Sequence, residues 1–188
     1  MAATHTDISP EFAAWIAEQP LFFVGSAPLA QDGHVNLSPR GLDTFRVLGP
    51  RQAAYIDLTG SGNETAAHLH ENGRITVMFC AFSGKPRILR LYGRGRVITP
   101  SEPAWPDFRT HFPEHLAGVR QIVTIEVERI QTSCGFGVPL MDYSGQRETL
   151  TQWAERKGPE GLQEYRRSKN ARSLDDLPTP GLGDDSQS

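Results

Sequence analysis

The sequence predicts a mainly β protein, a closed or partly closed antiparallel barrel of six or seven strands with small helices around it. Short runs of alternating apolar and polar residues come as hairpins, with no long crossover helix between them. The 18 glycines and 14 prolines among 188 residues suit many tight turns. No glycine fingerprint follows the first predicted strand, which argues against a dinucleotide-binding βαβ unit.

The N-terminal part should form a short helix and then two hairpins. Ser9 can cap the helix SPEFAAWIAEQ, and Pro10 suits its first position. Phe12, Trp15 and Ile16 form one apolar stripe on that helix. The expected hairpins are LFFVGSAPL with HVNLSP around the turn QDGH, and FRVLG with AAYIDL around GPRQ.

A polar loop, LTGSGNET at residues 58–65, leads into the predicted helix ETAAHLHEN, which Gly73 can end. The loop holds two glycines, three hydroxyl side chains and an asparagine. Two interpretations remain open on these residues alone. Ser61 and Glu64 fit the spacing of a capping box, in which case the loop only caps the helix. Alternatively, the free N–H groups of the helix N-terminus bind a phosphate.

Two long strand patterns follow. The clearest hairpin joins RITVMFCAF to RILRLYGRGRVI through SGKP, and one face of its second strand should pack inward. That face carries Leu89, Leu91, Gly93, Gly95 and Val97. The other carries Ile88, Arg90, Tyr92, Arg94 and Arg96, which would meet solvent or a second subunit. In the last strand, VRQIVTIEVERI, one face carries Val119, Val123, Ile125 and Val127. The opposite face carries Arg120, Thr124, Glu126 and Glu128.

The rest of the chain is predicted to form helices and a C-terminal tail. Residues 99–115 are interrupted by prolines and should hold one short helix. Two helices are expected in a C-terminal extension, residues 145–170, separated at Gly158. Residues 175–188 are polar and rich in proline and glycine, which indicates a loose tail. The whole chain, 1–188, is expected to be one domain with its core at about 20–130.

Composition excludes several classes of protein. A net charge of −3 gives no general attraction to nucleic acid or to anionic membranes. Two cysteines, Cys80 and Cys134, are too few for a disulfide framework or a cysteine-rich metal cage. The N-terminus lacks the basic and apolar regions of a secretory signal, and no apolar run reaches the length of a membrane span. We therefore expect a cytoplasmic protein.

Four phrases of the sequence, HVNLSPRG, AAYIDLTGSGNETAAHL, RITVMFCAF and PRILRLYGRGRV, together resemble the pyridoxamine 5′-phosphate oxidase-related, FMN-binding family. The resemblance covers residues 20–130 and is strongest to a less characterised branch of the family. It implies a split β-barrel and a homodimer that holds two FMN molecules in clefts between the subunits. It also implies that the FMN phosphate lies against residues 58–65, which favours the phosphate-binding interpretation of that loop.

The resemblance and the local chemistry together name the candidate site. The residues that we expect to bind the cofactor are Ser38, Arg40, Leu58, Thr59, Ser61, Gly62, Asn63, Glu64, Thr65 and Arg87. The oxidases place an arginine and a lysine in the first helical turn, where this chain has Glu64 and Thr65. Positive charge must then come from elsewhere, and Arg40 and Arg87 are the candidates because a guanidinium suits a dianionic phosphate.

Two other departures separate the chain from true pyridoxamine phosphate oxidases. Ile88 stands where the oxidases have a glutamine that contacts the flavin. The C-terminal sequence EYRRSKNARSLDDLP lacks the expected tryptophan and spacing, and Arg166 and Arg167 read as the basic end of a helix. The sequence therefore predicts a relative of these oxidases that does not oxidise pyridoxamine phosphate.

No catalytic residue and no metal site emerge from the sequence. His111 and His115 have a zinc-like spacing, but Pro113 lies between them and no third ligand is evident. The leading hypothesis is an FMN-dependent oxidoreductase that acts on an unknown small molecule, with the cofactor performing the chemistry. The alternatives are a flavin carrier or redox sensor without turnover, a deazaflavin-binding protein, and a haem-binding split barrel with His111 or His115 as axial ligand.

Overall fold

The computed structural model describes residues 2–182. Its eight strands form one antiparallel sheet in the order β3-β2-β6-β7-β8-β5-β4, with β1 paired to β8. The strands are β1 (Ala3–His5), β2 (Phe22–Ser26), β3 (Asn36–Arg40), β4 (Phe45–Gly49), β5 (Gln52–Leu58), β6 (Arg74–Cys80), β7 (Ile88–Ile98) and β8 (Val119–Ser133). The helices are α1 (Pro10–Ala17), α2 (Glu64–Asn72), α3 (Trp105–Arg109) and α4 (Thr149–Lys169).

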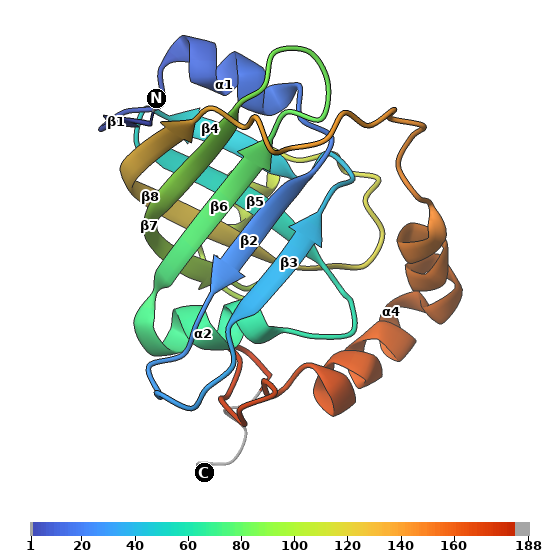
Figure 1. The fold of residues 1–188 in the computed structure, drawn as a ribbon. Coiled ribbons are helices and arrows are strands. Elements are labelled where there is room, and N and C mark those ends of the chain that lie inside the picture. The colour runs from blue at the N-terminus through green and yellow to red at the C-terminus, as the bar shows by residue number, and fades with distance from the viewer. Residues whose placement is uncertain (1, 183–188) are drawn as a thin grey trace.

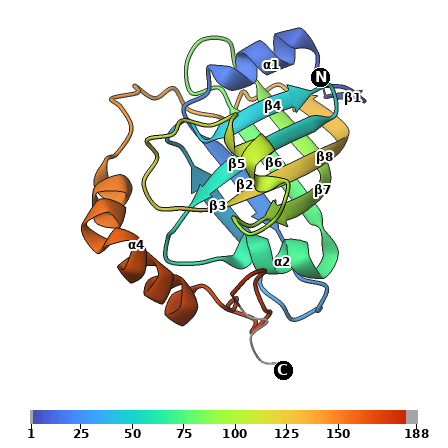
Figure 2. The same cartoon turned by 180° about the vertical axis from the view of Figure 1, so that it is seen from behind.

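The sheet curls into a split barrel that is not closed, since β3 and β4 end the strand order without pairing to each other. Figure 1 shows β2, β3 and β6 at the front with β5 and β8 behind them, α1 at one end and α2 at the other. The reverse view in Figure 2 shows α4 standing beside the barrel. The predicted fold class is confirmed, and seven of the strands correspond to the seven predicted runs. The eighth, β1, has three residues and is too short to show a period.

Aromatic side chains fill the barrel between its two sides. Phe22, Phe45 and Phe79 lie with ring centroids 5.0–5.8 Å apart, and Phe22 also lies 5.7 Å from the buried ring of Tyr55. Such tilted and edge-on pairs add to the stabilisation from burying the rings. The predicted helix start is confirmed nearby, because the Ser9 hydroxyl accepts a hydrogen bond from the Phe12 N–H at 3.2 Å.

Strand β8 departs from the predicted alternation at its beginning. Asp57 of β5 pairs with Gln121, but Leu58 pairs with Val119, so Arg120 is an extra residue in a bulge. The bulge reverses the faces of the residues before it. As a result Arg120 is 5% exposed, although the alternation placed it on the face opposite Val123, and Val119 packs against a second apolar cluster that includes Ile122.

The C-terminal part is more ordered than its composition indicated. Helix α4 is two helical pieces joined at Gly158, whose φ of 66° and ψ of 173° break the helix as predicted. The following C-terminal segment (residues 170–182) is packed on the barrel, with Asn170 and Thr179 buried. The expected loose tail is thus wrong for residues 175–182, and residues 183–188 lie outside the described part of the chain. In residues 2–182, no helix is both long and apolar enough to cross a bilayer.

Candidate functional site

The glycine loop (residues 58–65) connects the end of β5 to the start of α2. Asn63 is the N-cap residue of α2, and no side chain caps the N–H groups of its first turn within the described residues. The capping box that the spacing of Ser61 and Glu64 allows is therefore not formed. Instead, the Glu64 carboxylate accepts the N–H of Leu174 at 2.9 Å, in the C-terminal segment. The helix N-terminus thus keeps donor groups that suit an anion.

A buried carboxylate lies directly before the loop. Asp57 is 1% exposed and forms ion pairs with Arg40 at the end of β3 and with Arg120 in the β8 bulge. Arg120 Nη2 and Gln121 Nε2 both donate to Asp57 Oδ2 at 2.8 Å. Burial alone would raise the pKa of Asp57, but the guanidinium of Arg120, followed by that of Arg40, holds this pKa below its usual range.

The Asp57 network extends into the glycine loop. Arg120 Nη1 donates to the backbone oxygen of Gly62 at 3.0 Å. Gln121 Nε2 also donates to Asn63 Oδ1 at 2.8 Å. The ion pair between Arg40 and Asp57 joins β3 to β5 across the open side of the barrel. The side chains of Arg120 and Gln121 therefore hold the loop on the side that faces the Asp57 network.

The C-terminal segment fixes the same loop from the other side. Asn170 Nδ2 donates to the backbone oxygen of Gly60 at 3.0 Å, while Asn170 Oδ1 accepts from Arg120 Nη1 at 2.8 Å. Arg166, in the last turn of α4, donates from Nε to the hydroxyl of Thr59 at 2.9 Å. Its Nη2 donates to the backbone oxygen of Val119 at the same distance. The loop is thus held by groups more than a hundred residues further along the chain.

A cavity of about 950 Å³ opens beside the loop and reaches to α4. Gly60, Ser61 and Arg40 line it at the barrel, and Trp153 and Tyr165 line it on the helix. The two rings on α4 meet edge to face, with their centroids 5.0 Å apart. A volume of this size is at the upper end of the range for small-molecule sites. The cavity therefore combines a polar, cationic end with an aromatic wall.

Comparison with known proteins identifies the family. The profile described as Pyridoxamine 5′-phosphate oxidase matches residues 8–134. The chain belongs to the pyridoxamine 5′-phosphate oxidase family. It is 42% identical, over 194 aligned positions, to the "Pyridoxamine 5′-phosphate oxidase family protein ustO" of Aspergillus flavus, covering 95% of this chain and 78% of that one.

Solved structures share the fold at low sequence identity. HupZ of group A Streptococcus superposes with a TM-score of 0.56 and 20% identity, over 67% of this chain and 99% of that one. A FAD-binding protein of Mesorhizobium loti gives a TM-score of 0.47 and 13% identity, over 70% and 96% of the two chains. The likeness to HupZ supports the split-barrel fold of this member of the family.

The structure places most of the predicted site residues of this family member together. Arg40 is connected to the loop by its ion pair with Asp57. Ser38 is connected to it through Asn36. The Asn36 side chain accepts a hydrogen bond from the Ser38 hydroxyl and donates one to Thr65 Oγ1 at 3.0 Å. The remaining residues of this group form the loop itself, namely Leu58, Thr59, Ser61, Gly62, Asn63 and Glu64. The hydroxyl of Thr59 is already engaged within the chain, because it donates to the Gly118 oxygen.

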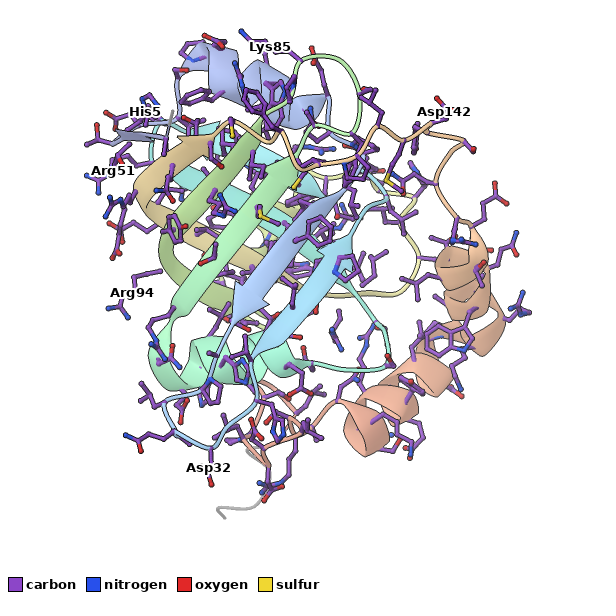
Figure 3. The ribbon with its side chains drawn as sticks, viewed as in Figure 1. His5, Asp32, Arg51, Lys85, Arg94 and Asp142 are labelled. Carbon is purple, nitrogen blue, oxygen red and sulfur yellow. The ribbon has the colours of Figure 1, made fainter. Side chains whose placement is uncertain are left out.

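Arg87 is the exception among the predicted residues. Its guanidinium forms an ion pair with Glu11 at 3.1 Å and lies over the rings of Phe12 and Trp15 on α1. Figure 3 shows the neighbouring Lys85 beside α1, at the opposite end of the barrel from Asp32 near α2. Within one chain, therefore, Arg40 is the predicted arginine that lies at the glycine loop.

Several site residues escaped the sequence reasoning. They include Asp57, Arg120, Arg166 and Asn170. Asp57 could have been noticed, because it is a lone carboxylate in the apolar run AAYIDL. Arg120 is brought inside by a bulge that the alternation of residues does not reveal. Arg166 and Asn170 come to the loop only through the tertiary position of α4.

Proposed function

We propose that this chain binds FMN at the glycine loop and is a flavin-dependent oxidoreductase of a small molecule. The observation that carries the proposal is the position of the glycine loop. The loop lines a large cavity with Gly60 and Ser61, beside Arg40, and leads into the uncapped N-terminus of α2. A helix N-terminus beside guanidinium groups favours a phosphate dianion. Membership of the pyridoxamine 5′-phosphate oxidase family supports a flavin as the molecule that carries this phosphate.

The residues present fit such a group. Arg40 Nε is buried and has no hydrogen-bond partner among residues 2–182, which leaves a cationic donor near the loop unsatisfied. The one carboxylate of the first helical turn, Glu64, is held by the Leu174 N–H. That contact gives one carboxylate oxygen a donor, while the other lies 3.8 Å from the position of a Cβ atom on Gly62, so a negative charge remains beside the loop.

Each part of the site has a definite task under this proposal. The N–H groups of the loop and Ser61 would bind the phosphate, while Arg40 would supply positive charge. The apolar wall around Trp153 and Tyr165 would exclude water from the rest of the cavity. The bound flavin would supply hydride or electron transfer. The protein would act by binding and orienting it and by setting its electrostatic surroundings.

The absorption spectrum of the purified protein tests the proposal, together with the mass of any molecule that heat releases. Flavin bands and the mass of FMN are expected. A haem spectrum, a deazaflavin mass, or a colourless protein that does not bind added FMN would contradict it. Steady-state oxidation of a reduced nicotinamide by the FMN-loaded protein is also expected. FMN binding without turnover of any reductant would instead indicate a flavin carrier or redox sensor.

Replacing Ser61 with aspartate should weaken FMN binding by about tenfold or more. The new carboxylate would stand at the cavity end of the glycine loop, and two like charges about 4 Å apart repel by roughly 1–4 kcal/mol between water and a protein surface. The measurement is a fluorescence titration of the apoprotein with FMN. Ser101→Asp adds the same charge at another exposed serine and should bind normally. Full flavin occupancy of Ser61→Asp would contradict the assignment of the loop.

We further propose that the working unit is a homodimer with the flavin between its subunits. The edge strand β3, the residue before it and the segment after β8 carry apolar side chains that a single copy leaves exposed. They include Val35 (78% exposed), Leu37 (65%), Phe136 (82%) and Leu140 (80%). Exposed apolar groups of this kind mark interaction surfaces. Analytical ultracentrifugation of the FMN-loaded protein should give the mass of a dimer, and a flavin-loaded monomer would refute this arrangement.

A further inference from the structure

The surroundings of the glycine loop hold more positive than negative charge. Three arginines, Arg40, Arg120 and Arg166, meet there with two carboxylates. Asp57 forms ion pairs with both Arg40 and Arg120. Glu64 accepts a backbone N–H in the C-terminal segment. Among residues 2–182, Arg166 has no ion pair. Burial and then repulsion by Arg120 lower the pKa of Arg166 from its usual value. An anion at this place would relieve that repulsion.

Arg166 is held in a fixed orientation on the loop. Its Nε and Nη2 are engaged by the Thr59 hydroxyl and the Val119 oxygen, both at 2.9 Å. Its Nη1 has no hydrogen-bond partner within the described chain. A guanidinium with two nitrogens anchored and a third one free is prepared to bind an anion, since little side-chain entropy remains to be lost.

The rest of α4 explains why Arg166 reaches the loop. Leu162 is buried one turn earlier, which fixes the face that the helix presents to the barrel. One turn later, Asn170 ties the end of the helix to Gly60 and Arg120. Arg167, in contrast, is exposed and pairs with Glu164 on its own helix at 3.0 Å. Two neighbouring arginines therefore have entirely different surroundings.

We propose that Arg166 is a phosphate-binding residue that supplies, from the C-terminal helix, the positive charge that the first turn of α2 lacks. The inference rests on the proposed FMN site and deepens it. It assigns recognition of the phosphate to a residue outside the matched region 8–134. The simpler alternative is that Arg166 only attaches α4 to the barrel through Thr59 and Val119.

The affinities for FMN and riboflavin separate these two roles, because the two ligands differ only by the phosphate. In Arg166→Ala, the dissociation constant for FMN should rise about 10- to 100-fold, as expected for the loss of a charge-assisted hydrogen bond. The dissociation constant for riboflavin should change by less than about threefold. Arg166→Lys keeps the charge and should restore part of the preference for FMN. Arg167→Ala is the matched control and should bind both ligands like the unaltered protein.

Each outcome has a definite meaning. An equal loss of affinity for FMN and riboflavin in Arg166→Ala would overturn the assignment and leave Arg166 as an attachment point of α4. If neither ligand binds to the unaltered protein, the proposed function itself is wrong. Should Arg166→Ala fail to fold, Arg166→Gln, which retains a donor for Thr59, carries the same comparison. An unchanged preference for FMN in Arg166→Gln would equally overturn the inference.

Discussion

Replacing Asp57 with asparagine is expected to lower the free energy of unfolding by about 3–5 kcal/mol, because it leaves two guanidinium groups without their buried counter-ion. The side chains of Asp57 and Arg120 are 2% and 3% exposed, and that of Arg40 is 20% exposed, so solvent cannot replace the lost charge. Urea unfolding at neutral pH measures the effect. We expect a lower midpoint with an unchanged slope.

Asp43→Asn is the matched control for Asp57→Asn. Asp43 also pairs with an arginine, Arg46, at 2.8 Å, but its side chain is 76% exposed. Exposed pairs of this kind contribute about 0–1 kcal/mol, so this variant should unfold almost like the unaltered protein. Equal losses in the two variants would contradict the role of Asp57 as the centre of a buried network.

The Asp57 carboxylate also makes the stability of the protein depend on pH. The pKa of Asp57 is lowered in the folded protein, so its stabilising contribution is fully present above the pKa of an unfolded aspartate, about 3.9. The contribution is lost as the pH falls through the lower, folded value. The difference in stability between the unaltered protein and Asp57→Asn should therefore be constant between pH 5 and 7. It should shrink below about pH 4.

Replacing Gly93 with alanine is expected to destabilise the protein by about 3 kcal/mol or more, at the upper end of the range for overpacking. A Cβ atom on Gly93 would lie 1.9 Å from the backbone oxygen of Glu126 in the neighbouring strand. Gly93 sits where the pairing of β7 and β8 shifts register, and a backbone group in the middle of a sheet cannot move aside. Thermal unfolding followed by circular dichroism measures the loss.

Gly137→Ala serves as the control for Gly93→Ala. A Cβ atom at Gly137 meets no atom within 4 Å, so its stability should change by no more than about 0.5 kcal/mol. A Gly93→Ala protein as stable as Gly137→Ala would mean that β7 and β8 are not packed as closely as the structure has them.

The elements that depend on local chemistry could be predicted from the sequence. Ser9 and Pro10 define the start of α1, Gly73 ends α2 with a φ of 71°, and Gly158 divides α4. Each of these residues acts through its own backbone conformation or through a bond to a neighbour. For the same reason, the alternating pattern of β7 correctly assigned Leu91 to the buried face.

The candidate site was predictable only in part. The glycine loop and Arg40 lie together as expected, but the residues that hold them depend on contacts distant in sequence. A bulge turned Arg120 inward, where alternation placed it on the face opposite Val123. The composition of the C-terminal segment indicated disorder, whereas Thr179 is buried and donates to the Asn170 oxygen at 2.7 Å. Tertiary contacts overrode local preference at both places.

The contact between Asn170 and Gly60 also sets the order in which the protein can mature on the ribosome. All eight strands have been synthesised once Ser133 has been added, so the nascent chain can assemble its barrel before the second half of α4 exists. The glycine loop must then wait for Arg166 and Asn170 before it acquires its complete set of hydrogen bonds. The site is therefore completed only after the barrel that carries it.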